Sequence, residues 1–133
     1  MTWQDTYLGT QVAIVAASDD AYAVLDEAGW TSFGSGGCAV LAVALTRVVE
    51  GELFAITVQE VQGEVDHVCV RVGDDAYIDQ DGAYSSRQML TKHLELEGRA
   101  GHLALIQGDD FGEIECPEWA VAAMEGLLRE RLE

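Results

Sequence analysis

The chain has 133 residues, of which 49% are hydrophobic and one is proline, and its 24 acidic and seven basic side chains give a formal net charge of −17. This length and composition predict a single domain, residues 1–133, with a buried core, and they exclude a disordered chain. The apolar runs are too short to span a bilayer, and a surface this negative repels nucleic acid and anionic lipid. We therefore expect no membrane and no direct nucleic-acid contact.

The first third of the chain is predicted to be helical. Ser18 or Asp19 can cap a helix over residues 18–28, which Gly29 ends. A glycine-containing loop over residues 30–37 leads into a second helix, residues 37–50, in which apolar residues recur at helical spacing.

The middle of the chain is predicted to form a meander of strands. The predicted strands cover residues 53–59, 65–72 and 76–79, with a turn over 73–75 between the last two. In the strand 65–72 the valines at even positions face one way, and His67, Cys69 and Arg71 face the other.

Two further helices and a strand complete the pattern. Ser85 or Ser86 can cap a helix that runs to about Glu97, residues 102–107 form a strand, and residues 118–132 form an amphipathic helix after Pro117. This order predicts an α+β fold, with N-terminal helices packed on a small antiparallel sheet and a C-terminal helix.

The three cysteines are considered singly. Cys38, Cys69 and Cys116 are widely spaced and form no CxxC pair, which indicates neither a disulfide framework nor a structural zinc site. The N-terminus has no basic segment followed by an apolar one, so we expect no secretory signal and a cytoplasmic protein. We expect no cofactor and no metal.

Cys38 is the candidate nucleophile. It follows Gly-Ser-Gly-Gly and opens the predicted helix, where unpaired N–H groups and the helix dipole favour a thiolate. The backbone N–H groups of Gly37 and Cys38 are the candidate donors to an oxyanion. Cys38 also shares an apolar stripe with Leu41 and Leu45, so a structural role in the core stays open.

His67 and Asp79 are the candidate partners of Cys38. His67 lies near the start of the strongest predicted strand, where a rigid scaffold can hold it as a general base. Asp79 ends the neighbouring strand, from which a carboxylate can orient the imidazole and stabilise its cation. Asp81 is the alternative third member, and a solvated turn is the structural alternative for both acids.

These segments resemble the papain-like cysteine peptidases and acyltransferases. Gly-Gly-Cys-Ala-Val-Leu-Ala resembles their nucleophile helix, and Asp-His-Val-Cys-Val-Arg-Val followed by Asp-Asp-Ala-Tyr-Ile-Asp-Gln-Asp-Gly resembles their histidine strand and third-residue strand. The second stretch is also similar to arylamine N-acetyltransferases and transglutaminase-like proteins. The resemblance covers roughly residues 34–84, and at this length the chain resembles the compact bacterial and phage-type members. It implies a papain-like core with Cys38 as nucleophile, His67 as general base and acid, and Asp79 as the orienting group.

Two classes of function follow. The first is an enzyme that attacks a peptide, isopeptide or other acyl substrate through Cys38 and forms an acyl-enzyme, which water or an amine resolves. The second is a non-catalytic acidic protein on the same scaffold, which binds a basic protein partner as an inhibitor or nucleic-acid mimic. A catalytically silent accessory protein, and acidity that serves only solubility or high salt, are further alternatives.

Overall fold

The computed structural model describes residues 1–30, 33, 37–58, 65–106 and 116–133. The helices in these ranges are α1 (Trp3–Ala16), α2 (Asp19–Ala28), α3 (Gly37–Thr46), α4 (Ser86–Glu97) and α5 (Glu118–Leu132). The strands are β1 (Glu52–Thr57), β2 (Val65–Val72), β3 (Ala76–Asp79), β4 (Gly82–Tyr84) and β5 (His102–Leu105). The protein is therefore α+β, as the sequence predicts. Residues 31–32 and 34–36 of the predicted loop, and the predicted strand ends at 59 and 107, lie outside the described residues.

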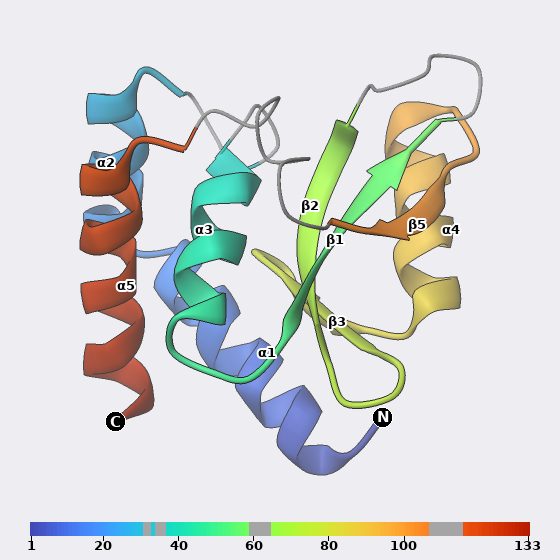
Figure 1. Cartoon of the computed structure of the whole chain (residues 1–133), viewed down its shortest axis with the longest axis horizontal. Helices are drawn as coiled ribbons and strands as arrows, with labels where there is room; N and C mark the ends of the chain where they lie inside the picture. Colours follow the sequence, from blue (N-terminus) through green and yellow to red (C-terminus); the bar gives the residue numbers. More distant parts are fainter. Residues whose placement is uncertain (31–32, 34–36, 59–64, 107–115) are drawn as a thin grey trace.

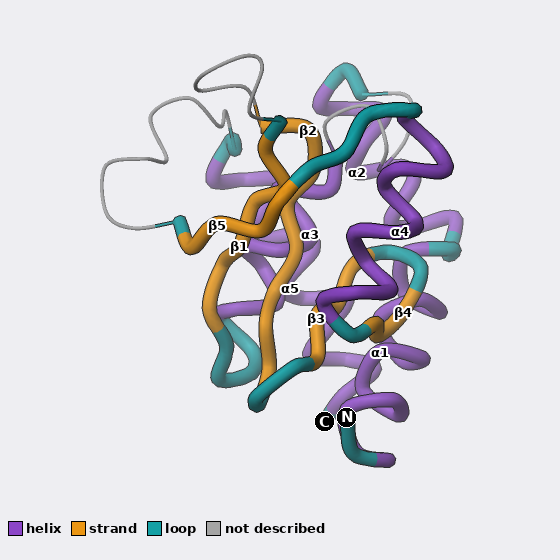
Figure 2. The backbone as a smooth tube through the Cα atoms, turned by 90° about the vertical axis from the view of Figure 1, so that its right-hand side faces the viewer, coloured by secondary structure: helices purple, strands orange, loops and turns teal. Residues whose placement is uncertain are grey.

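The strands form one antiparallel sheet in the order β4-β3-β2-β1-β5. Helices α1, α2, α3 and α5 lie on one side of this sheet and α4 lies on the other (Figure 1, Figure 2). The larger part of the core fills the first side, and a smaller cluster of Ile56, Cys69, Tyr77 and Met89 lies under α4. Val68, Val70 and Val72 belong to the larger core and Cys69 to the smaller one, which confirms the predicted faces of β2 for these four residues.

The predicted helix caps are present. The Ser18 side chain accepts a hydrogen bond from the Ala21 N–H at the start of α2, and Gly29 ends that helix with a φ of 89°. Ser85 and Gln88 form a reciprocal capping box at the start of α4. Because each cap satisfies N–H groups that a helix leaves unpaired, these boundaries could be predicted from local sequence.

Two elements were not predicted. Helix α1 begins at a capping box between Thr2 and Asp5, but its exposed Trp3 and Tyr7 place apolar residues on the solvent side and obscure the amphipathic pattern. Strand β4 has only three residues, too few to show an alternation.

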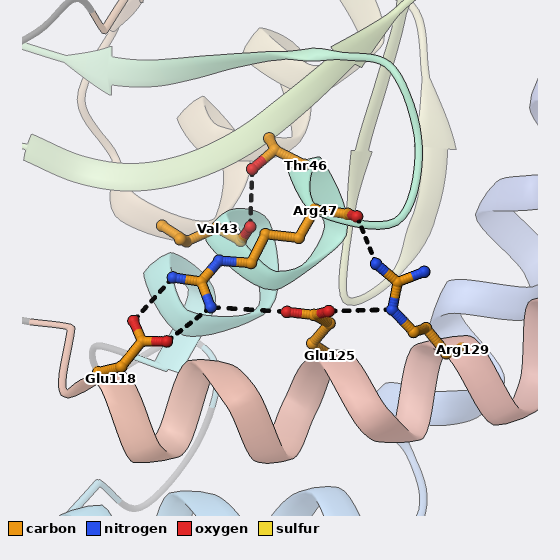
Figure 3. Close-up of polar contacts among 6 residues, drawn as sticks. All are labelled: Val43, Thr46, Arg47, Glu118, Glu125 and Arg129. Atoms are coloured by element: carbon orange, nitrogen blue, oxygen red, sulfur yellow. Dashed lines mark hydrogen bonds and ion pairs between the residues drawn. The ribbon is translucent and has the colours of Figure 1, made fainter.

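Helix α3 ends at Thr46, earlier than the predicted residue 50, and its end is fixed to α5. Figure 3 shows the Arg47 guanidinium against two acids of α5: it donates to Glu118 at 2.8 and 2.7 Å and approaches Glu125 at 3.5 Å. The Arg47 carbonyl oxygen accepts a hydrogen bond from Arg129 at 2.8 Å. The contact with Arg129 gives a partner to the carbonyl of Arg47, the residue that follows α3, and the ion pairs connect this end of the helix to α5.

Candidate active site

The Cys38 thiol lies at the start of α3. The helix begins at Gly37, and both residues are buried in the core between α3 and the sheet. The N–H groups of a helix's first turn have no intrahelical partner, so this position offers donors to a negative sulfur or to an oxyanion. The backbone of Ala39 and that of Val68 both act to lower the pKa of the Cys38 thiol, so α3 and β2 each contribute to its surroundings.

His67 connects Cys38 to Asp79. The Nε2 atom of His67, on β2, lies 2.8 Å from Oδ2 of Asp79 at the end of β3. The imidazole also lies close enough to the Cys38 side chain for each group to shift the pKa of the other. Because Nε2 is occupied by Asp79, Nδ1 is the ring nitrogen left for the sulfur. The structure thus brings the three predicted residues together, with His67 between the Cys38 thiol and the Asp79 carboxylate.

Both oxygens of the Asp79 carboxylate accept hydrogen bonds. Its side chain is completely buried. Oδ1 accepts the N–H of Asp81 at 2.8 Å, and Oδ2 accepts a hydrogen bond from Lys92 Nζ at 2.7 Å in addition to that of His67. A carboxylate held by three donors has one orientation, which fixes the plane of the imidazole.

Asp81, the alternative third residue, has a different place. Its carboxylate is half exposed and accepts a hydrogen bond from Lys92 at 2.8 Å, and the described contacts of the His67 ring do not include it. Lys92 therefore bridges the two acids, and its ammonium lies 4.5 Å from the centre of the Tyr84 ring.

The electrostatics favour a charged Cys38–His67 pair. Burial alone would raise the pKa of the Cys38 thiol, but the hydrogen bond and charge of His67 lower it below its ordinary value, helped by the backbone of Val68 and Ala39. Burial alone would lower the pKa of His67, but the hydrogen bonds and charges of Asp79 and Cys38 raise it to about 9. A thiolate beside an imidazolium is the reactive form of a cysteine nucleophile.

Asp79 and Lys92 stay charged together. Burial alone would raise the pKa of Asp79, but His67 and Lys92 lower it. Burial alone would lower the pKa of Lys92, but Asp79 and Asp81 raise it. The buried carboxylate therefore carries the negative charge that a protonated His67 needs.

Sequence reasoning missed Lys92 and a neighbouring group around Asp66. Lys92 comes from α4, and the available signal was that it is the only lysine in a chain of net charge −17. Asp66 precedes His67 and lies 3.0 Å from His93 Nε2 and 2.9 Å from Arg99 Nη2. In the described part of the chain, no three histidine, cysteine or acidic side chains gather as metal ligands would, and no helix there is long and apolar enough to cross a membrane.

Comparison with known proteins does not add to this geometry. The chain matches no protein-family model, no curated protein and no solved structure. The function is therefore argued from the site itself.

Proposed function

We propose that the protein is a papain-like cysteine peptidase, amidase or acyltransferase that works through Cys38, His67 and Asp79. The observation that carries the proposal is the position of the Cys38 thiol, at a helix start, beside a His67 imidazole that is hydrogen-bonded to the buried Asp79 carboxylate. The order along the chain, a helix with the cysteine, then a strand with the histidine and a strand with the acid, resembles that of this superfamily and supports the proposal. The free thiols suit a reducing compartment, which supports a cytoplasmic location.

The reaction has two halves. The Cys38 thiolate attacks the carbonyl carbon of an amide, isopeptide or thioester, and the backbone N–H groups of Gly37 and Cys38 stabilise the oxyanion. The bond to the leaving group breaks as His67 gives it a proton, which leaves an acyl-enzyme. Water or an amine then gives a proton to His67, bonds to the acyl carbon and releases the thiolate. Asp79 holds the imidazole in the required orientation throughout.

Cysteine alkylation tests the nucleophile directly. We would react the protein with iodoacetamide from pH 4 to 10 and follow Cys38, Cys69 and Cys116 separately by mass spectrometry. Cys38 is expected to react much faster than the other two at pH 6, because an ordinary thiol with a pKa near 8.5 is less than ~1% thiolate there. His67→Ala should slow Cys38 by at least about tenfold.

The matched control is His102→Ala, which removes an exposed histidine hydrogen-bonded to Thr57 on the far edge of the sheet. It should leave the Cys38 profile unchanged. Equal reactivity of Cys38 in the wild-type and His67→Ala proteins would refute the ion pair. Turnover is then tested on amide, isopeptide and thioester substrates, with Cys38→Ala as the inactive reference, and activity that survives Cys38→Ala would exclude Cys38 as nucleophile.

The charge supports a second proposal, that the same scaffold binds a basic protein partner. A net charge of −17 favours association with cationic surfaces and should make binding fall steeply as salt rises. Binding of immobilised polylysine or a basic nucleic-acid-binding protein, compared at about 50 and 500 mM salt, measures this. Strongly salt-dependent binding that Cys38→Ala leaves intact would favour this function, and equal affinity at both salt concentrations would refute it.

A further inference from the structure

Lys92 is held against the acid of the candidate active site. It belongs to α4, which covers the face of the sheet opposite to α3 (Figure 1). Its Nζ atom donates a hydrogen bond to Oδ2 of Asp79 at 2.7 Å and another to Asp81 at 2.8 Å, and it lies 4.5 Å from the centre of the Tyr84 ring. The Lys92 side chain is only 19% exposed. Two carboxylates and an aromatic ring thus fix the ammonium group in one place.

Lys92 and His67 share one oxygen atom of Asp79. Nε2 of His67 lies 2.8 Å from Oδ2, the atom to which Lys92 donates at 2.7 Å, whereas Oδ1 accepts the backbone N–H of Asp81. Because both nitrogens bond the same atom they are close neighbours, and two positive charges so close repel each other. Burial strengthens this repulsion, since the Asp79 side chain is completely buried and that of His67 is 12% exposed. A charged Lys92 therefore makes the protonated form of His67 less favourable than Asp79 alone would make it.

The other charges near His67 have partners of their own. Among the described residues, the titratable and charged side chains that act on His67 or line the hollow beside it are Cys38, Asp66, Asp79, Lys92, His93 and Glu97. Asp66 is paired with His93 at 3.0 Å and with Arg99 at 2.9 Å. Lys92 is the cation in this set that shares an anion with His67.

The repulsion matters most in the acyl-enzyme. Before acylation, burial alone would lower the pKa of His67, but Asp79 and Cys38 together raise it to about 9. Once the sulfur of Cys38 is part of a thioester it carries no charge, and this support for the imidazolium is lost. His67 must then be neutral, because it takes a proton from the attacking water or amine. A buried carboxylate with no second cation beside it would favour the protonated ring, which cannot act as a base.

We propose that Lys92 is a positioning residue that keeps His67 available as the base in the second half of the reaction, by binding the same oxygen of Asp79. This role rests on the proposed function above. In that half, the oxygen of water or the nitrogen of an amine bonds to the acyl carbon, its proton passes to His67, and the C–S bond breaks so that Cys38 leaves as the thiolate. Lys92 touches none of the reacting atoms and acts through Asp79 on the proton affinity of His67.

The titration of His67 tests this role without turnover. The Cys38→Ala protein has no charge at the position of the sulfur, as in the acyl-enzyme, and NMR of ¹⁵N-labelled histidine follows the His67 ring from pH 4 to 10. The His67 signals are those that His67→Ala removes. In this background Lys92→Met should raise the midpoint by at least about 0.5 pH units, which is about threefold in proton affinity. Lys92→Arg keeps the positive charge and should reverse most of this rise.

The direction of the shift separates an effect of charge from one of structural support. If Lys92 only held Asp79 in place, its loss would loosen the bond between Asp79 and His67, and the midpoint would fall. A fall in Lys92→Met, or no change, therefore overturns the proposal. Lys92→Gln offers an N–H donor without the charge and should also raise the midpoint, so the test stands even if Lys92→Met does not fold, and circular dichroism checks the fold of each variant.

Arg71→Met is the matched control. It removes a cation from the same strand as His67, four residues further along β2, where Arg71 forms an ion pair with Glu52. This change should leave the midpoint of His67 unaltered. A rise as large as that of Lys92→Met would show that any lost positive charge has this effect, and it would overturn the specific role of Lys92.

The failure of this proposal and that of the proposed function can be told apart. Fast alkylation of Cys38, with a His67 midpoint that does not rise in Lys92→Met, refutes the role of Lys92 alone. A rise of the midpoint with an unreactive Cys38 refutes the proposed function, and with it the part of Lys92 in acyl transfer.

Discussion

The contrast between Asp79 and Asp81 gives the sharpest prediction about the site. Both acids accept a hydrogen bond from Lys92, but only Asp79 is bonded to His67. Asp79→Asn should therefore reduce the reactivity of Cys38, and Asp81→Asn, a matched change two residues away, should leave it close to wild type.

The expected size follows from the pKa of His67. A rise from an ordinary 6.5 to about 9 corresponds to about 3–4 kcal/mol, at about 1.4 kcal/mol per pH unit, and Asp79 and Cys38 share it. If Asp79 supplies half, Asp79→Asn weakens the protonated imidazole by roughly ten- to twentyfold. The Cys38 thiolate at pH 6 depends on that cation, so its alkylation rate should fall by a similar factor.

The assay is iodoacetamide alkylation with separate detection of each cysteine, on wild-type, Asp79→Asn and Asp81→Asn proteins from pH 4 to 10. Asp79→Asn should move the rise of the Cys38 rate to higher pH, and thermal unfolding checks that the variant remains folded. If Asp81→Asn slows Cys38 as much as Asp79→Asn does, Asp81 shares the orienting role. If neither variant changes the profile, the carboxylate does not support the pair and the reasoning is wrong.

Two further predictions concern the scaffold. Lys92→Met should lower the free energy of unfolding at pH 7 by about 1–3 kcal/mol, because it removes a partner of a buried carboxylate. The lowered pKa of Asp79 gives stability that is present above about pH 4 and is lost as pH falls through the folded-state pKa, so the difference from wild type should shrink in acid. Urea unfolding of both proteins at pH 7 and pH 3 measures this difference. Gly9→Ala should destabilise the protein by about 1–3 kcal/mol, because a Cβ there would overlap the backbone nitrogen and the Cβ of Ala83. Gly126→Ala, at a position in α5 with open space around it, should stabilise the protein by about 0.5–1 kcal/mol. Equal melting temperatures for these two variants would contradict the packing of α1 on β4.

The sequence could predict what local chemistry determines. Ser18 and Gly29 mark the ends of α2 because cap residues satisfy the backbone of their own helix. The alternation of β2 places Val68 in the larger core and Cys69 in the smaller cluster, because successive side chains of a strand point to opposite faces of the sheet. His67 and Asp79 could be expected near one another because they lie on neighbouring strands that a short turn joins, although the register that pairs Val70 with Ile78 does not set them directly opposite.

Long-range placement could not be predicted in the same way. Helix α4 shows a clear cap and pattern, but neither says which face of the sheet it covers. Its position on the face opposite α3 is what brings Lys92 to Asp79 and His93 to Asp66. From sequence alone, the polar residues of an amphipathic helix are predicted to face solvent. No periodic pattern in the sequence indicates which of them contact residues on distant strands.

The three cysteines show why the acidity of the chain does not prevent a thiolate. A negative protein disfavours a further negative charge, and burial adds to that effect. Burial raises the pKa of Cys116 to about 11 and that of Cys69 still further, with nearby negative charges adding to both. Cys38 is buried as well, yet its pKa moves the other way, because His67 and the backbone of two elements face its sulfur. All three thiols share one net charge, so differences among their alkylation rates report their local surroundings, burial included, and we expect the order Cys38, Cys116, Cys69 from fastest to slowest.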